Sequence, residues 1–287
     1  MVPHSLSTNV AAHAVVTAGV PAIDALRDAA PPAGVPPLPG RFLRHADEHA
    51  VVALRAVQEA LASAPDLVAG RDRHAVVAAP CGAGRPTAAR TLVQLRESGA
   101  VSVSPHVVPH CSLHAIASAV SVGLGMHGAN IGVGGGPDAL FEGCLAALSL
   151  AAGPDTDVCW LVLTAWDHEP VLDGRGNTPA DAVCRAVALA LSATAVAGAR
   201  LTLRPGLPTS VAIGGPWGAG DGPRDLAAFA AALSGPVSDQ GARRAAAGRA
   251  PDCDGCLWSL RGGGGARVSL HGPERASEAC TALSEAA

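Results

Sequence analysis

The segment HGANIGVGGGPDALFEG, residues 127–143, decides the fold of this chain. Ile131 and Val133 are β-prone residues that lead into three glycines at 134–136. Pro137 and a helix-like segment follow. Many enzymes place a nucleophile or a bound phosphate at a strand-to-helix turn of this kind. This turn instead carries Pro137, which is neither a nucleophile nor a backbone N–H donor.

Outward from this turn, apolar β-prone runs alternate with helical patterns. Strands are predicted at residues 13–19, 73–84, 129–135, 157–167, 199–206 and 209–216, and as two short strands within 256–272. Helices are predicted at residues 22–30, 44–64, 87–98, 112–125, 138–152 and 223–234 and at the end of the chain, and residues 180–193 form a further apolar segment. Residues 101–110 are predicted to be extended and broken by two prolines. Several strands are apolar on both faces, which predicts an α/β fold with buried sheets.

Composition excludes several classes of function. The chain has 287 residues, enough for one large domain, and a net charge of −4 without any basic block. Binders of single-stranded nucleic acid usually have basic grooves with interleaved aromatic residues, and only 2% of these residues are aromatic. All 20 basic residues are arginine, which excludes Schiff-base chemistry on lysine and the Walker A lysine. No apolar run reaches membrane-spanning length and no signal peptide is evident, so we expect a cytoplasmic protein without a membrane partner.

The cysteines and histidines do not predict a metal site. The eight cysteines are scattered, and several stand in apolar runs, which favours small buried side chains over disulfides. Cys253 and Cys256 form a single C-x-x-C pair, but zinc needs four ligands. His110 and His114 are spaced i, i+4, yet the helix is expected to begin near residue 112, and residues 98–128 contain no carboxylate. We expect no metal and no cofactor.

Four segments together resemble a known family. They are VSPHVVPHCSLHAIASAVSVGLGMHGANIGV (103–133), DVCWLVLTAWDHE (157–169), CLWSLRGGGGARVSLHG (256–272) and HAVVTAG (13–19). Their order resembles the β-ketoacyl synthases, and particularly the chain-length factors that are the non-catalytic partners of these enzymes. The resemblance implies a thiolase-like layered αβαβα fold and one ketosynthase-like domain over residues 1–287. Residues 1–203 would be its N-terminal half, and residues 204–287 an abbreviated C-terminal half.

The departures from the family concern its catalytic groups. A ketosynthase carries at this turn the cysteine that takes the acyl chain, and Pro137 stands at that position here. Two later histidines of the family polarise the thioester carbonyl and drive decarboxylation, but residues 169–270 contain no histidine. The nearest cysteine, Cys144, falls within the next helix. We therefore expect no catalytic residue and no activity of the chain alone. Pro137 with Asp138 and Glu142 suits the start of a helix instead.

A subunit of this kind would form a heterodimer with an active β-ketoacyl synthase. It would close the far end of the partner's acyl tunnel in polyketide or fatty-acid-like synthesis, polyenes included, on substrates held by an acyl carrier protein. The resemblance also implies that strand 129–135 lies at the centre of the subunit and pairs across the dimer. The candidate residues for this interface and tunnel are His106, Val107, His110, Leu113, His114, Asn130, Ile131 and Val133.

Other interpretations are weaker. A Rossmann site needs G-x-G-x-x-G, which Pro137 interrupts, and the segment CGAGRPTAAR (81–90) lacks the lysine of a phosphate loop. Asp167, His168 and Glu169 end an apolar strand, where a His–Glu pair could act as the general base of a stand-alone acyltransferase or hydrolase. A pseudoenzyme that binds a small ligand in the remnant pocket near Pro137 is the last alternative.

Overall fold

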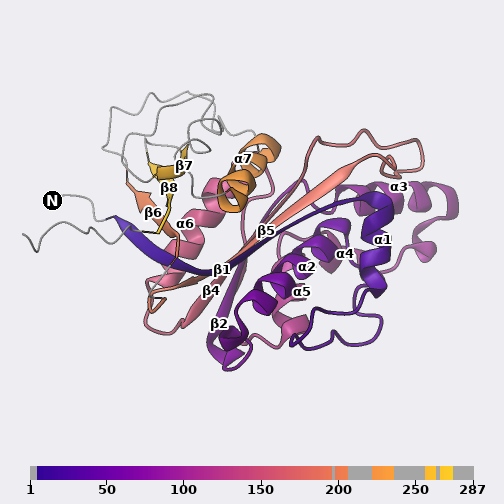
Figure 1. Ribbon diagram of the computed structural model, residues 1–287. Helices are drawn as coiled ribbons and strands as arrows, with labels where there is room; N and C mark the ends of the chain where they lie inside the picture. The colour runs from indigo at the N-terminus through magenta and orange to yellow at the C-terminus, as the bar shows by residue number, and fades with distance from the viewer. Residues whose placement is uncertain (1–4, 196–197, 206–221, 236–255, 263–265, 274–287) are drawn as a thin grey trace, which may run out of the picture.

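The computed structural model describes residues 5–195, 198–205, 222–235, 256–262 and 266–273. These residues form one mixed sheet with helices on both faces (Figure 1). The strands are β1 Leu6–Gly19, β2 His74–Cys81, β3 Asn130–Gly132, β4 Val158–Trp166, β5 Val183–Ser192, β6 Arg200–Arg204, β7 Cys256–Arg261 and β8 Arg267–His271. The helices are α1 Val20–Asp28, α2 Glu48–Ser63, α3 Arg85–Ser98, α4 Val107–Cys111, α5 Ala115–Leu124, α6 Ala139–Ala151 and α7 Gly222–Ser234, with short 3-10 helices at Pro65–Leu67, Arg71–Arg73 and Ala100–Ser102.

The sheet has the strand order β3-β2-β4-β5-β1-β6-β8-β7. β2 pairs in parallel with β3 and β4, and the remaining pairs are antiparallel. β4 occupies an interior position because its sequence is apolar on both faces, and all nine of its residues are buried. The predicted strand at 157–167 is therefore confirmed almost to the residue.

Two apolar cores lie on opposite faces of the sheet because successive residues of a strand point to opposite sides. Trp160 and Val162 face α1, α2 and α5, whereas Leu161 and Leu163 face α6 and α7. Helix α2 was predicted to bury one face, but from its first residue to Leu61 only Glu59 is exposed. This helix lies under α1, α5 and the loop after α1, which together cover its outer side (Figure 1).

The long strand β1 joins two parts of the sheet. The described strands form a single sheet, in which β1 has a neighbour on each side. On one side β1 pairs with β5 from Asn9 to Gly19, with a register shift between Val10 and Ala12. On the other side, the residues from Leu6 to Asn9 pair with β6. The strands β6, β8 and β7 thereby continue the sheet beyond β1.

Two local predictions in the segment before β3 are wrong. Residues 101–110 are not extended, because the 3-10 helix Ala100–Ser102 and helix α4 occupy most of them. Pro109 stands in the first turn of α4, where its missing N–H is not needed. Helix α5 was predicted to be buried on most sides, yet Val122 is 68% exposed, so only one face is buried.

Some predictions fall on residues that the structure does not describe. The strand at 209–216, the terminal helix and Cys253 lie outside the described ranges. Within those ranges, Cys144, Cys159, Cys184 and Cys256 are buried, as predicted, whereas Cys81 and Cys111 are half-buried. None of the helices that the structure describes is long and apolar enough to cross a membrane.

Candidate functional site

The turn between β3 and α6, here called the elbow (residues 132–138), is fastened to the end of β2. Cys81 and Gly135 form a parallel β-bridge, in which the Gly135 N–H donates to the Pro80 carbonyl at 2.9 Å. The Gly82 N–H donates to the Gly135 carbonyl at 3.3 Å. Gly134 and Gly135 have φ angles of 82° and 99°, which glycine adopts at little cost. The shape of the turn therefore accounts for the glycines that the sequence places there.

Leu113, a candidate interface residue, packs directly on the elbow. A Cβ atom at Gly132 would lie 2.3 Å from the Leu113 carbonyl oxygen. A Cβ atom at Gly135 would lie 2.7 Å from Leu113 Cδ2. The close approach of the two backbones at Gly132 is possible only because that residue has no side chain.

Pro137 lies on the surface of the elbow and is exposed. It was predicted to stand in the first turn of the helix, but α6 begins two residues later, and Asp138 is its N-cap residue. The Ala139 N–H donates to the Gly136 carbonyl at 3.1 Å, so Pro137 belongs to a tight turn that precedes the helix. Glu142 does stand in the first helical turn, as predicted, where an acidic side chain is favourable.

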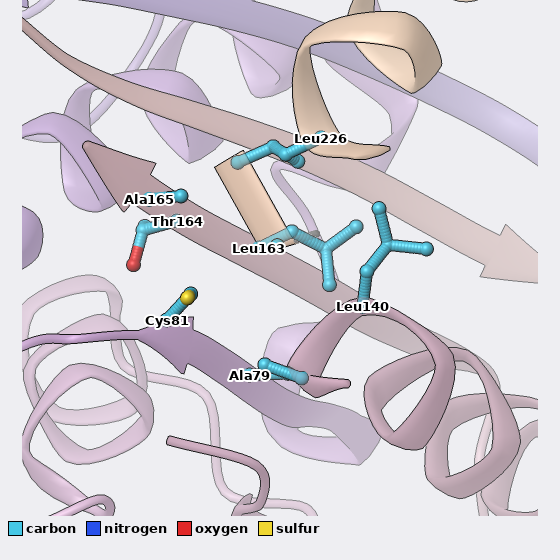
Figure 2. A pocket seen from close by; sticks show the side chains of 9 residues that line it. Ala79, Cys81, Leu140, Leu163, Thr164, Ala165 and Leu226 are labelled. Atoms are coloured by element: carbon cyan, nitrogen blue, oxygen red, sulfur yellow. The ribbon is translucent and has the colours of Figure 1, made fainter. Parts of the chain in front are cut away.

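A small cavity lies next to the start of α6. It lies between β2, β4, α6 and α7, and its volume is about 10 Å³, which is close to the room that one water molecule needs. Figure 2 shows Leu140, Leu163 and Leu226 gathered around it, with Cys81 and Ala79 on the adjoining strand. This cavity has no room for an acyl group, and Pro137 is not among the residues that line it.

Cys144, the cysteine nearest to the elbow in sequence, does not replace a nucleophile there. It lies one turn into α6 and is completely buried, and burial raises the pKa of its thiol to about 12. The thiolate is the reactive form of cysteine, so Cys144 is inert at neutral pH.

Strand β3, which carries Asn130 and Ile131, is an edge strand of the subunit. The prediction that it lies at the centre of the subunit is wrong, because β2 is the only described strand that pairs with it. The Val133 N–H donates to the Ala78 carbonyl and the Val76 N–H donates to the Ala129 carbonyl. The backbone groups of Ala129 and Val133 thus bond to β2. Because alternate residues of a strand bond to opposite sides, the backbone groups of Asn130 and Gly132 point to the unpaired edge.

The four histidines between residues 106 and 127 lie at the surface rather than in one group. His106 precedes α4 and His114 precedes α5, and both are exposed, as is His127. His110 is half-buried within α4, so it does not share a helix with His114. Val107, the remaining candidate of this segment, is half-buried at the start of α4.

A buried polar cluster at the start of α2 was not found from the sequence. Asp47 is the N-cap of α2, where its Oδ1 accepts the His49 N–H at 2.9 Å and its Oδ2 accepts the Gly84 N–H at 3.2 Å. His49 Nδ1 lies 2.8 Å from Thr164 Oγ1, and its ring meets the Trp166 ring edge-on at 5.3 Å. In the sequence, the run HADEHA indicates only a charged helix start, and its burial arises from contacts with β4.

Burial governs the charges of this cluster. It lowers the pKa of His49 to about 4, so the imidazole is neutral at neutral pH. Burial also raises the pKa of both Asp47 and Glu48, and the charge of Asp47 further raises the pKa of Glu48. Arg90 partly opposes these shifts, with its Nη2 3.5 Å from Glu48 Oε1. The cluster ties α2 to β4 and to the loop at 82–84, which in turn holds the elbow.

The strand-end trio of Asp167, His168 and Glu169 does not form a catalytic pair. Asp167 accepts bidentate hydrogen bonds from Arg185, and Glu169 forms an ion pair with Arg85. His168 is exposed. Each carboxylate is thus engaged by an arginine, so neither is positioned to orient the imidazole of His168 as a general base.

Comparisons with known proteins identify the fold. No protein-family model matches the sequence, and no curated protein matches it. Among solved structures, the chain is similar to a chain of the complex described as "Ketosynthase (ApeO) in Complex with its Chain Length Factor (ApeC) from Xenorhabdus doucetiae". The TM-score is 0.54 at 15% identity, over 93% of this chain and 99% of that chain. This chain has the ketosynthase fold. The fold implied by the sequence resemblance is therefore confirmed.

Two further ketosynthase structures give TM-scores below 0.5. The ishigamide ketosynthase/chain length factor gives a TM-score of 0.45 at 18% identity, over 67% of this chain and 63% of that chain. A β-ketoacyl synthase from Burkholderia phymatum gives 0.47 at 15% identity, over 80% of this chain and 70% of that chain. This chain thus spans about three fifths of the ishigamide protein chain but nearly all of the first chain.

Proposed function

We propose that this chain is a non-catalytic, ketosynthase-like subunit that pairs with an active β-ketoacyl synthase. The free edge of β3 carries the proposal. An unpaired strand edge presents backbone donors and acceptors that another strand can complete. At this edge the backbone groups of Asn130 and Gly132 point away from β2, and no other described strand pairs with them.

Exposed apolar side chains gather in the segment that leads to β3. Of the eight large apolar side chains that are exposed in the described residues, six fall between residues 92 and 122: Leu92, Leu95, Val101, Val108, Leu113 and Val122. Apolar surface concentrated in one segment indicates a protein interface, since isolated exposed apolar residues are normally scattered. This segment and β3 together would form the partner surface.

The elbow supports the non-catalytic role. Pro137 offers no nucleophile, Cys144 is buried, and the adjoining cavity is the size of one water molecule. The reaction would then take place in the partner, which also would receive the acyl carrier protein. His106, Val107, His110, Leu113 and His114 would line the far end of the partner's acyl tunnel in polyketide or fatty-acid-like synthesis, polyenes included.

The alternatives have no comparable support. A stand-alone acyltransferase or hydrolase would need His168 next to a carboxylate that is not already bound by arginine. A ligand-binding pseudoenzyme would need a pocket that includes Pro137, whereas the small cavity at the start of α6 is not lined by Pro137 and is too small for an organic molecule.

The test is co-purification with a ketosynthase encoded beside this chain, comparing Asn130→Pro with Asn130→Ala. The Asn130 N–H points to the free edge, so proline removes a donor to the partner and leaves the bonds to β2 intact. We expect the complex to form with the wild-type chain and with Asn130→Ala, and to be lost with Asn130→Pro although that variant stays folded. A folded wild-type chain that never binds the ketosynthase contradicts the proposal.

The proposed tunnel lining is tested separately, by measuring the chain length of the products. In an assembled complex, Val107→Trp should shorten the products because the larger side chain fills the end of the tunnel. Val171→Trp is the matched control, since Val171 is 87% exposed and belongs neither to the candidate tunnel lining nor to the proposed partner surface. Unchanged product lengths with Val107→Trp would contradict the assignment of these residues to the tunnel. That result would not contradict the proposed heterodimer.

A further inference from the structure

A second cavity lies on the face of the sheet opposite to α6 and α7. It is bounded by the end of α1, the loop that follows α1, and Arg55 in the middle of α2. The loop runs beside α2 at the lower right of Figure 1. The cavity volume is about 220 Å³. A cavity of about 150 Å³ can hold benzene, so this one has room for a small organic ligand.

The cavity is cationic. Three guanidinium groups line it, from Arg27, Arg41 and Arg55, against one carboxylate, Asp28. Three positive charges less one negative charge leave the lining at +2. No part of the proposed heterodimer surface contributes to this charge, so the following inference does not depend on the proposed function.

Arg55 is a buried cation whose hydrogen bonds all go to neutral acceptors. Only 6% of the residue is exposed. Its guanidinium donates to the carbonyls of Leu26 and Ala29 and to Gln58 Oε1. The charge of Glu59 also acts on Arg55, but no described carboxylate accepts a hydrogen bond from it, which favours a directly bonded anion in the adjoining space.

Arg27 is held in place in a similar way. Its Nη1 donates to the carbonyls of Leu43 and Ala46 at 2.8 and 2.7 Å, and its Nε donates to the exposed Asp24 at 3.3 Å. These bonds leave Nη2 without an acceptor among the described residues. Backbone carbonyls thus fix the orientation of two guanidinium groups before any ligand arrives, which reduces the entropy lost on binding.

Arg41 adopts an unfavourable backbone conformation at the rim of the cavity. Its φ angle is 64°, and among the described residues no other non-glycine residue has a positive φ. Glycine or asparagine would adopt this conformation more easily. Strained backbone of this kind is concentrated at functional sites, so its occurrence on a cavity-lining arginine suggests that the side chain is needed.

The lining of the cavity also has an apolar part. Leu38 and Phe42 line it, and both pack against α5 at Gly123, where an added Cβ would lie 3.0 Å from Phe42 Cε1. The cavity therefore combines guanidinium groups with an aromatic and an aliphatic side chain.

We propose that this cavity binds a small phosphate monoester that carries a short apolar group. A phosphate monoester has a charge between about −1.5 and −2 at pH 7, which matches the lining better than a single carboxylate does. Guanidinium groups bind phosphate oxygens through paired, charge-assisted hydrogen bonds. The apolar group of the ester would lie against Phe42 and Leu38.

The experiment is calorimetric titration of the full chain, alone or in the complex in which it purifies, with phenyl phosphate, inorganic phosphate and benzoate. We expect phenyl phosphate to bind more tightly than inorganic phosphate, because of the apolar wall, and about tenfold more tightly than benzoate. No heat of binding with phenyl phosphate, or equal affinity for benzoate, overturns the proposal.

Matched variants separate the cavity from general surface charge. Arg41→Asn removes the guanidinium and keeps a residue suited to the positive φ, so we expect phenyl phosphate to bind about tenfold more weakly. Arg44→Asn changes the net charge equally on the same loop, but Arg44 does not line the cavity. We expect less than a twofold change there. Equal weakening in both variants, with both folded by circular dichroism, overturns the proposal.

Discussion

Two regions contact the same loop at residues 82–84: the buried cluster of Asp47, Glu48 and His49, and the elbow at Pro137. Catalysis requires both titratable groups and access for a substrate, and the two regions differ in which of these features they have. The cluster has titratable groups, and His49 is completely inaccessible. The elbow is accessible at Pro137, and Asp138 is its only titratable side chain. Active sites combine perturbed titratable groups with access for a substrate. Their separation in this chain favours a structural role for both regions.

The largest expected effect is a loss of folding stability when the pH falls and the buried cluster is protonated. His49 has a pKa of about 4 in the folded chain against 6.5 when unfolded, so the unfolded chain binds more protons between these values. Stability should therefore be complete above about pH 6.5 and decrease by up to about 3 kcal/mol as the pH falls to about 4. The raised pKa values of Asp47 and Glu48 act in the opposite direction.

The His49→Asn variant isolates the histidine from those carboxyl groups, because it retains them. Urea unfolding of both proteins across this pH range should give a smaller loss of stability in the variant. Identical pH dependence in the two proteins would show that His49 is not buried as a neutral imidazole, and the contrast between cluster and elbow would no longer hold.

The next effect tests the packing of the elbow. Gly132→Ala places a Cβ 2.3 Å from the Leu113 carbonyl oxygen, which is backbone and cannot turn aside. We expect a loss of about 2 kcal/mol in the free energy of unfolding. Gly136→Ala is the control, because nothing lies within 4 Å of its added Cβ, and it should change stability by less than about 0.5 kcal/mol. Equal losses would mean that the elbow is not closely packed on Leu113.

The prediction with the smallest expected effect asks whether a nucleophile at the elbow would restore catalysis. Pro137→Cys introduces a thiol at an exposed position, so we expect iodoacetamide to label it while Cys144 stays unmodified. Because residues 169–270 contain no counterpart of the two catalytic histidines of ketosynthases, the purified variant should still fail to decarboxylate a malonyl thioester. Mass spectrometry measures the labelling, and a thioester assay measures turnover. Turnover by Pro137→Cys alone would show that the site had lost only its nucleophile.

The parts of the fold that are specified locally could be predicted from the sequence. β4 is a continuous apolar run, and its limits at Val158 and Trp166 fall within one residue of the prediction. α6 and α7 were predicted equally closely because their helical patterns are uninterrupted. Helix α4 was missed because two prolines suggested an extended chain, whereas Pro109 occupies a helical position that tolerates proline.

The features that depend on distant contacts could not be predicted. The position of β3 at the edge follows from strand order, which its own residues do not encode. The burial of Asp47 and His49 depends on Thr164 and Trp166, more than a hundred residues away. A charged helix start is usually solvated, so no signal in the run HADEHA distinguishes this cluster. The residues of the arginine-lined cavity are likewise brought together only by the path of the loop after α1.

The double pairing of β1 has a consequence for how the chain is made. Asn9 lies opposite Ser192 on one side and Arg200 on the other, so the first strand to be synthesised waits for residues that follow nearly two thirds of the chain. Contacts so distant in sequence slow folding. Until then, the emerging polypeptide exposes a long β-prone strand with two unsatisfied edges. Assembly at the ribosome, rather than stability once folded, is therefore the stage at which this protein is most vulnerable to aggregation.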